Sequence, residues 1–355
     1  MAGLKYWVWL SEVKGLTNRS KLLLLDYFGT PENVYYADED EYRLVEGIEP
    51  RQIALLAEKS LENADRILGA CSRLGLRLLT MQDADYPMRL RNIFEPPCLL
   101  YVKGQLPVID EEVAVAMVGT RKASPYGIET AEKLAYGLCR QGAVVISGAA
   151  AGVDSASHRG ALRAGGKTIA VLGNGLDIVY PAENEWLYRD IAASGALISE
   201  YPPGTAAEAW HFPVRNRIIS GLCLATVVVE APLERSGALI TANTALEQGR
   251  DVFAVPGPID ASASRGCNRL IADGAAALIT DSWDVLREYE AMYPHKILGE
   301  RVELPHALGY QARTEQAEAK AAETPAEAEA LPALDLIGDH GLTDDQMKLL
   351  RELAQ

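Results

Sequence analysis

The chain has 355 residues, of which 48% are hydrophobic and 23% are charged, a composition typical of a globular protein. Its length exceeds that of most single domains, so we expect two or three domains with one sizeable core. The formal net charge of −15 excludes a surface that attracts nucleic acid everywhere, and it confines any such binding to a local patch of positive charge.

The five cysteines are widely spaced and form no Cys-x-x-Cys pair, which indicates free thiols in a reducing compartment. The five histidines do not cluster at metal-ligand spacing, so we expect neither a metal nor a cofactor. The apolar run Tyr6–Leu10 lacks the layout of a signal peptide, and no later run reaches the length of a membrane span. We therefore expect a cytoplasmic protein.

Residues 1–84 show helical periodicity and predict a small helical domain. Within it, Val13–Leu16 and Val45–Ile48 each place a glycine between apolar residues, as in helix-hairpin-helix modules, whose turns offer backbone N–H groups to a phosphate. Glu46 and Glu49 would repel a phosphate and favour simple helix-ending turns, but both interpretations stay open. A proline-rich connector, Asp85–Gly104, then predicts an extended path into one edge strand.

From Val113 to about Asp281, short β-branched runs alternate with helical patterns. This alternation predicts an α/β fold over residues 85–295, with a doubly wound and mostly parallel sheet. The predicted strands are Val113–Val118, Val144–Ser147, Thr168–Val171, Ala196–Ser199, Ala225–Glu230, Asp251–Ala254 and Ala276–Ile279.

The pattern ends after residue 295. Residues 296–333 are rich in Ala, Glu and Thr and predict a mobile acidic linker. Residues 334–355 predict one helix, an incomplete C-terminal segment that cannot fold alone. Twelve acidic and five basic side chains between 300 and 355 place much of the negative charge in this part of the chain.

Two loops that follow predicted strands are suited to an anion. Gly119–Gly127 offers glycines, hydroxyls and the adjacent cations Arg121 and Lys122 at a strand-to-helix turn, although both cations could simply be solvated. Ser147–His158 has so few large side chains that a ligand could approach its backbone at Gly148 and Gly152. Neither loop has the G-x-G-x-x-G spacing of a dinucleotide site.

Asp154 and His158, within the second of these loops, lie one helical turn apart. Asp154 could cap a helix or face a ribose. For His158 we expect a structural hydrogen bond with Asp154 rather than acid–base catalysis.

A third stretch, Trp210–Arg217, combines rings, an asparagine and two arginines. Grooves for single-stranded nucleic acid use such groups, guanidinium for phosphate and rings for base stacking. The alternative is that the arginines fix a loop through ion pairs with Glu200 or Glu230. Apart from these two acids and Asp154 the loops offer no acid for catalysis, and no spacing identifies an enzyme.

With these motifs in order, the chain resembles the DprA/Smf family of DNA-processing proteins from bacterial natural transformation. The resemblance runs from about Asp85 to Tyr289. It rests on Gly119–Arg121, Tyr126–Gly127, Ser147–Asp154, Thr168–Gly175, Tyr180–Pro181, Ser199–Glu200, Phe212–Arg217, Ser236–Gly237 and Gly249–Gly257.

The resemblance implies that the sheet is an extended Rossmann-like domain. It also implies a homodimer without enzymatic activity, which binds single-stranded DNA in a basic pocket and helps to load the RecA recombinase. Three residues depart from the family pattern: Thr120 and Cys267 replace serines, and Ala151 often has a basic residue in its place. The family's C-terminal winged helix is missing or cut short. The DNA-binding residues expected by motif are Gly119, Thr120, Arg121, Lys122, Gly148, Gly152, Phe212, Arg215, Asn216, Arg217 and Asn268.

An alternative function belongs to another class, a nucleotide-binding or nucleoside-monophosphate phosphoribohydrolase-like enzyme on the same type of sheet. Glu230 near a nucleotide-sized rim motivates it. Those hydrolases carry a P-G-G-x-G-T-x-x-E signature, whereas this chain has Glu230–Gly237, EAPLERSG, in that region. The mismatch disfavours the enzyme.

Overall fold

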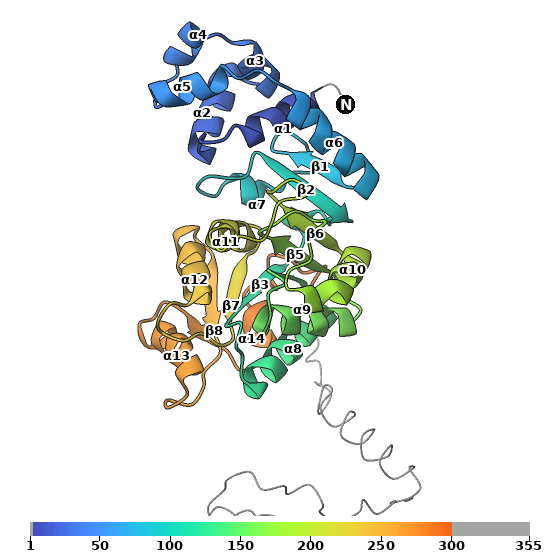
Figure 1. Ribbon diagram of the computed structural model, residues 1–355. Helices are drawn as coiled ribbons and strands as arrows, with labels where there is room; N and C mark the ends of the chain where they lie inside the picture. The colour runs from blue at the N-terminus through green and yellow to red at the C-terminus, as the bar shows by residue number, and fades with distance from the viewer. Residues whose placement is uncertain (1–2, 300–355) are drawn as a thin grey trace, which may run out of the picture. The chain divides into compact units, whose positions relative to one another are not determined.

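The computed structural model describes residues 3–299, which contain one nine-stranded sheet of order β1-β2-β6-β5-β4-β3-β7-β8-β9 (Figure 1). β2 is antiparallel to both of its neighbours, and all other pairs are parallel. The strands are β1 (Arg77–Thr80), β2 (Leu99–Gly104), β3 (Ala114–Val118), β4 (Val144–Ser147), β5 (Thr168–Leu172), β6 (Ala196–Ser199), β7 (Ala225–Val228), β8 (Asp251–Ala254) and β9 (Ala277–Leu278).

Among residues 3–299, six α-helices precede the sheet, seven lie between its strands and α14 follows the last strand. Those before it are α1 (Leu4–Glu12), α2 (Asn18–Phe28), α3 (Pro31–Tyr36), α4 (Glu39–Arg43), α5 (Pro50–Leu56) and α6 (Glu62–Leu74). The others are α7 (Met88–Arg91), α8 (Pro125–Arg140), α9 (Val153–Arg163), α10 (Glu185–Ser194), α11 (His211–Gly221), α12 (Gly237–Glu247), α13 (Arg265–Ala272) and α14 (Trp283–Leu286).

The core lies on both faces of the sheet because successive side chains of a strand point to opposite sides. In β3, Ala114, Ala116 and Val118 pack with α7, α11, α12 and α13, whereas Val115 and Met117 pack with α8, α9 and α14. Figure 1 shows α8, α9 and α10 on one side and α11 and α12 on the other. A doubly wound sheet buried on both faces explains the near-continuous apolar runs of its strands.

The N-terminal helices α1–α6 bury their apolar side chains in a cluster that also contains Leu99 and Tyr101 of β2 and Leu172 of β5. The helical region therefore packs directly on the antiparallel end of the sheet. Two domain boundaries stay predictions: the end of the helical domain at residue 84 and the end of the sheet domain at residue 295. The same holds for DNA contacts of the two glycine turns in the helical domain. The expected linker beyond residue 299 and the segment 334–355 lie outside the described residues.

The seven strands predicted from Val113 onward are confirmed, with β7 and β9 shorter than expected. Two expectations near the connector were wrong. Arg77–Thr80 is a strand, β1, which the helical pattern before it concealed. Because β1 pairs with β2, the connector's strand β2 lies inside the sheet rather than at its edge.

All five cysteines are buried and free, as the sequence predicted. Burial raises their pKa, for Cys71 to about 11, which keeps the thiols protonated and unreactive. Within residues 3–299, no helix is long and apolar enough to cross a membrane, and no three His, Cys, Asp or Glu side chains gather as metal ligands.

A first prediction concerns Gly104, at the end of β2. Its φ is +93°, and a Cβ there would lie 2.4 Å from the carbonyl oxygens of Ala192 and Gly195. Gly75 has a φ of +65° with open space around it. We expect Gly75→Ala to cost about 1 kcal/mol of unfolding free energy from backbone strain. Gly104→Ala should cost about 2 kcal/mol more, because fixed backbone must move. Equal losses in urea unfolding would contradict this account.

Candidate nucleic-acid interface

The candidate site is a cavity of about 560 Å³ at the carboxyl ends of the strands, where the sheet order reverses between β3 and β7. Open α/β sheets bind ligands at such a reversal, because the loops on either side of it diverge. The residues that line the cavity are Val118, Gly119, Thr120, Arg121, Lys122, Ala150, Asp154, Tyr180, Ala207, Ala209, Phe212, Pro213, Arg215, Asn216, Ile219, Pro232, Arg235, Ser236, Gly237, Ala238 and Thr241.

Hydrogen bonds between loops fix the rim. The Thr120 N–H donates to the Glu230 carbonyl oxygen at 2.8 Å, which joins the loops after β3 and β7. The buried Glu230 carboxylate accepts from the Ser124 backbone N–H at 2.9 Å and from its hydroxyl at 2.5 Å. Ser124 is also the N-cap of α8. Both carboxylate oxygens of Glu230 are thus engaged in holding the loop that carries Arg121 and Lys122.

Arg215, on α11, forms part of the floor of the cavity. Only 4% of it is exposed, and its Nη1 donates to the carbonyl oxygens of Gly148, at 3.0 Å, and Val171. Burial lowers the pKa of Arg215, but a guanidinium keeps its charge in proteins. Its hydrogen-bond partners are neutral carbonyl groups, and the buried Asp154 carboxylate is the nearby charge that favours its charged form.

The charge around the cavity is positive although the chain is acidic. Arg121, Lys122 and Arg235 are exposed at the rim, above Arg215. Among residues 3–299, none of these four cations forms an ion pair, and Asp154 is the one acid among the lining residues. A group of four cations that faces a single acid suits a phosphate.

Asp154 and His158 are buried, but they do not form the expected pair. The Ala150 N–H donates to Asp154 Oδ2 at 3.4 Å, whereas His158 Nδ1 lies 2.7 Å from the Thr168 hydroxyl. Burial raises the pKa of Asp154, and nearby Arg215 opposes the rise. Burial lowers the pKa of His158 to about 3, and Arg215 adds to this effect. His158 is therefore a neutral core residue.

Seven of the eleven site residues expected from the sequence line the cavity together; they are Gly119, Thr120, Arg121, Lys122, Phe212, Arg215 and Asn216. Gly148 and Gly152 do not, because protein atoms occupy the space in which we expected a ligand. A Cβ at Gly148 would lie 2.5 Å from Arg215 Nη2, and one at Gly152 would lie 2.3 Å from the Thr120 oxygen. Both glycines allow close packing beneath the site.

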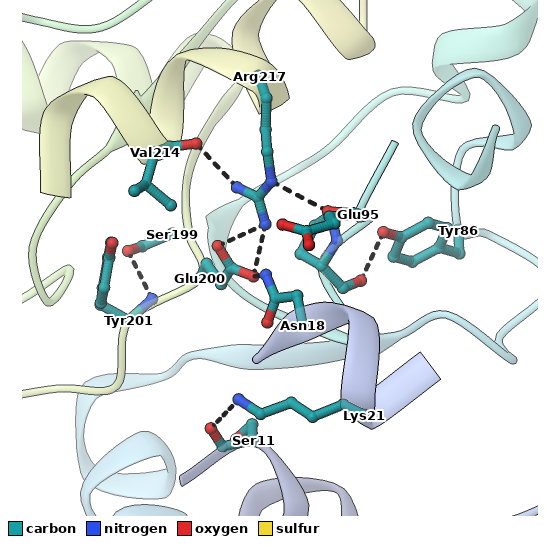
Figure 2. Close-up of polar contacts among 11 residues, drawn as sticks. Ser11, Asn18, Lys21, Tyr86, Glu95, Ser199, Glu200, Tyr201, Val214 and Arg217 are labelled. Carbon is teal, nitrogen blue, oxygen red and sulfur yellow. Dashed lines mark hydrogen bonds and ion pairs between the residues drawn. The ribbon is translucent and has the colours of Figure 1, made fainter. Parts of the chain in front are cut away.

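Asn268 and Arg217 also lie outside the cavity lining. The Asn268 amide exchanges two hydrogen bonds with the backbone of Gly257 and closes that loop. Figure 2 shows Arg217 facing Glu200, with its Nη2 2.8 and 2.9 Å from the two carboxylate oxygens. The ion-pair alternative therefore holds for Arg217 with Glu200.

The same ion pair reaches the N-terminal helices. Asn18, in the first turn of α2, donates its amide N–H to Glu200 at 2.9 Å (Figure 2). Arg217 further donates to the carbonyl oxygens of Glu95 and Val214. One arginine on α11 thus ties the helical region, the connector and the end of β6 together.

Among the lining residues that the sequence analysis did not expect at the site are a cation, Arg235, and an aromatic ring, Tyr180. Arg235 has a φ of +51° and lines the cavity opposite the β3 loop. Tyr180 stacks on Phe212, with ring centroids 5.6 Å apart. Tyr180–Pro181 was noted as a motif, but only the folded chain brings this ring beside the cations.

Fold and cavity define the class of protein: a Rossmann-type α/β protein with a cationic cavity at its switch point and without the G-x-G-x-x-G loop of a dinucleotide site. Residues 77–290 match the family model described as DNA recombination-mediator protein A. The chain therefore belongs to the DprA/Smf family of DNA recombination mediators.

Relatives agree with this assignment. DNA processing protein DprA of Streptococcus pneumoniae is 40% identical over 289 residues, which cover 80% of this chain and 98% of that protein. Its X-ray structure superposes with a TM-score of 0.70 at 39% identity, over 80% of this chain and 97% of that one. DNA processing protein A of Helicobacter pylori, a structure concerned with single-stranded DNA binding, gives a TM-score of 0.55 at 29% identity, over 61% and 97% of the chains.

The Arg217–Glu200 ion pair generates a second prediction. Its side chains are 12% and 17% exposed. Glu200→Gln leaves Arg217 without a carboxylate partner and should lower the free energy of unfolding by about 2 kcal/mol. Asp273→Asn removes the exposed pair with Arg269 and serves as a matched control, with an expected loss below about 0.5 kcal/mol. Similar losses in the two variants would refute the structural role of Arg217.

A third prediction follows from His158. Its folded-state pKa lies below the unfolded value near 6.5, so its contribution to stability is fully present above pH 6.5 and is lost as the pH falls towards 3. Between pH 6 and 4, the wild type should lose about 1.4 kcal/mol per pH unit relative to His158→Asn. Denaturant unfolding at several pH values measures this difference, and parallel pH profiles would exclude a buried neutral histidine.

Proposed function

We propose that this protein binds single-stranded DNA in the rim cavity and mediates the loading of RecA on that strand during natural transformation. The observation that carries the DNA-binding proposal is the set of four cations around the cavity, Arg121, Lys122, Arg215 and Arg235, in a protein of net charge −15. RecA loading, a homodimer and a cytoplasmic location are proposed from family membership.

The aromatic side chains of the cavity favour a single strand over a free anion. Phe212 lies in the cavity wall with the Arg121 guanidinium 4.7 Å from its ring centroid. Proteins that bind single strands pair cations that follow the backbone with rings on which bases stack. The relative from Helicobacter pylori, whose structure addresses single-stranded DNA binding, supports the same proposal.

The geometry does not favour the phosphoribohydrolase alternative. Glu230, its candidate catalytic residue, is 2% exposed and uses both carboxylate oxygens to hold Ser124. It is also absent from the cavity lining. Incubation with AMP should therefore release no ribose 5-phosphate.

A fourth prediction tests the proposed site. Arg121→Ala and Arg235→Ala should each weaken binding to an oligo-dT and reduce the slope of log affinity against log salt by about 0.7 for every phosphate that the variant no longer neutralises. Arg269→Ala is the matched control, an exposed arginine of α13 outside the cavity lining. Arg215 and Arg217 are unsuitable because both hold the fold. Fluorescence anisotropy between about 50 and 300 mM salt measures the effect, because screening of exposed charges grows over this range.

Binding that is unchanged in both cavity variants would overturn the site. RecA loading is tested separately, by whether the wild-type protein speeds RecA filament growth on DNA covered by a single-strand-binding protein. Arg121→Ala should lose this stimulation together with DNA binding. Stimulation without DNA binding would refute the proposed mechanism.

A further inference from the structure

The cavity has an aromatic wall that the cations do not explain. Tyr180 follows β5 and Phe212 lies in the first turn of α11, and their ring centroids are 5.6 Å apart with an interplanar angle of 27°. Tyr180 is 41% exposed, although a ring of this size is ordinarily buried more deeply. The wall and the cations line the same cavity of about 560 Å³.

The backbone that carries Tyr180 is fixed in place. The buried Tyr188 of α10 donates its hydroxyl to the Tyr180 carbonyl oxygen at 2.9 Å, and its oxygen lies 3.4 Å from the Tyr180 N–H. Within residues 3–299, the Tyr180 hydroxyl has no hydrogen-bond partner. The ring is therefore held at its base and stacked on Phe212 while its remaining surface faces outward. Such preorganisation lowers the entropic cost of receiving a flat ligand.

A phosphate ion does not stack on an aromatic ring. A nucleotide, in contrast, has a phosphate for the cations of this cavity and a base for its rings. Its phosphate suits Arg121 and Arg235, and its base suits a ring beside them. The volume lies within the ~300–1,000 Å³ of sites that enclose a small molecule. Bases within a duplex are already paired and stacked, so only an unpaired base is free to reach the ring.

We propose that Tyr180 is a base-stacking residue: it receives an unpaired nucleobase of the strand whose phosphates lie on the rim cations, and this contact makes the site select single strands. The proposal rests on the proposed DNA-binding function and deepens it. Tyr180 thus acts on the base, whereas Arg121 and Arg235 act on the backbone.

The test compares an oligo-dT with an abasic strand of the same length and charge. Tyr180→Ala should weaken oligo-dT binding on the order of tenfold, which corresponds to removing one base–aromatic stack, and leave the abasic strand unaffected. Tyr180→Phe keeps the ring and should bind both strands like the wild type. Trp186→Ala is the matched control, because Trp186 is 42% exposed and lies outside the cavity lining.

Each other outcome has a distinct meaning. Equal weakening of both strands, or no weakening, would overturn the role of Tyr180 as a base-stacking residue, provided that circular dichroism shows a folded variant. Failure of the wild type to bind either strand would instead overturn the proposed function. If thymidine monophosphate then bound and Tyr180→Ala abolished that binding, the base contact would stand and the ligand would be a free nucleotide.

Discussion

The buried guanidinium of Arg215 is the interaction on which the site depends. It fills the space beside Gly148 and joins α11 to the carboxyl ends of β4 and β5 through the carbonyl oxygens of Gly148 and Val171. Burying a cation is costly, and the nearby buried carboxylate of Asp154 offsets part of this cost for Arg215. The three exposed cations of the rim, Arg121, Lys122 and Arg235, then leave the cavity with more positive than negative side chains.

Glu230 stabilises the rim. Both of its carboxylate oxygens accept hydrogen bonds from Ser124 and so hold the loop that carries Arg121. The topology explains why few hydrogen bonds are enough to hold the rim. The loops after β3 and β7 diverge at the reversal of strand order, and one backbone hydrogen bond, from Thr120 to Glu230, fixes their separation. A rigid rim presents cations and rings in a fixed arrangement, as strand binding requires.

Arg217 shows how the same helix serves two purposes. The cavity is lined by Phe212, Arg215 and Asn216 of α11. Arg217, the next residue, instead pairs with Glu200, which also accepts a hydrogen bond from Asn18 of the N-terminal helices. Successive helical residues point about 100° apart, so a cluster that is continuous in sequence divides between two environments. The N-terminal helices are thereby linked, through Glu200, to the helix that forms one wall of the cavity.

The sequence by itself determined the α/β class, the strands from Val113 onward and most of the loops at the rim, because apolar runs and glycine turns are local signals. It also singled out Arg121, Phe212 and Arg215 by residue type. Only the tertiary structure decided that Arg217 pairs with Glu200, that Gly148 and Gly152 face protein, and that Arg235 and Tyr180 join the cavity. These features are contacts between residues that lie far apart in the chain. Such contacts produce no periodic pattern in the sequence, so only the folded structure reveals them.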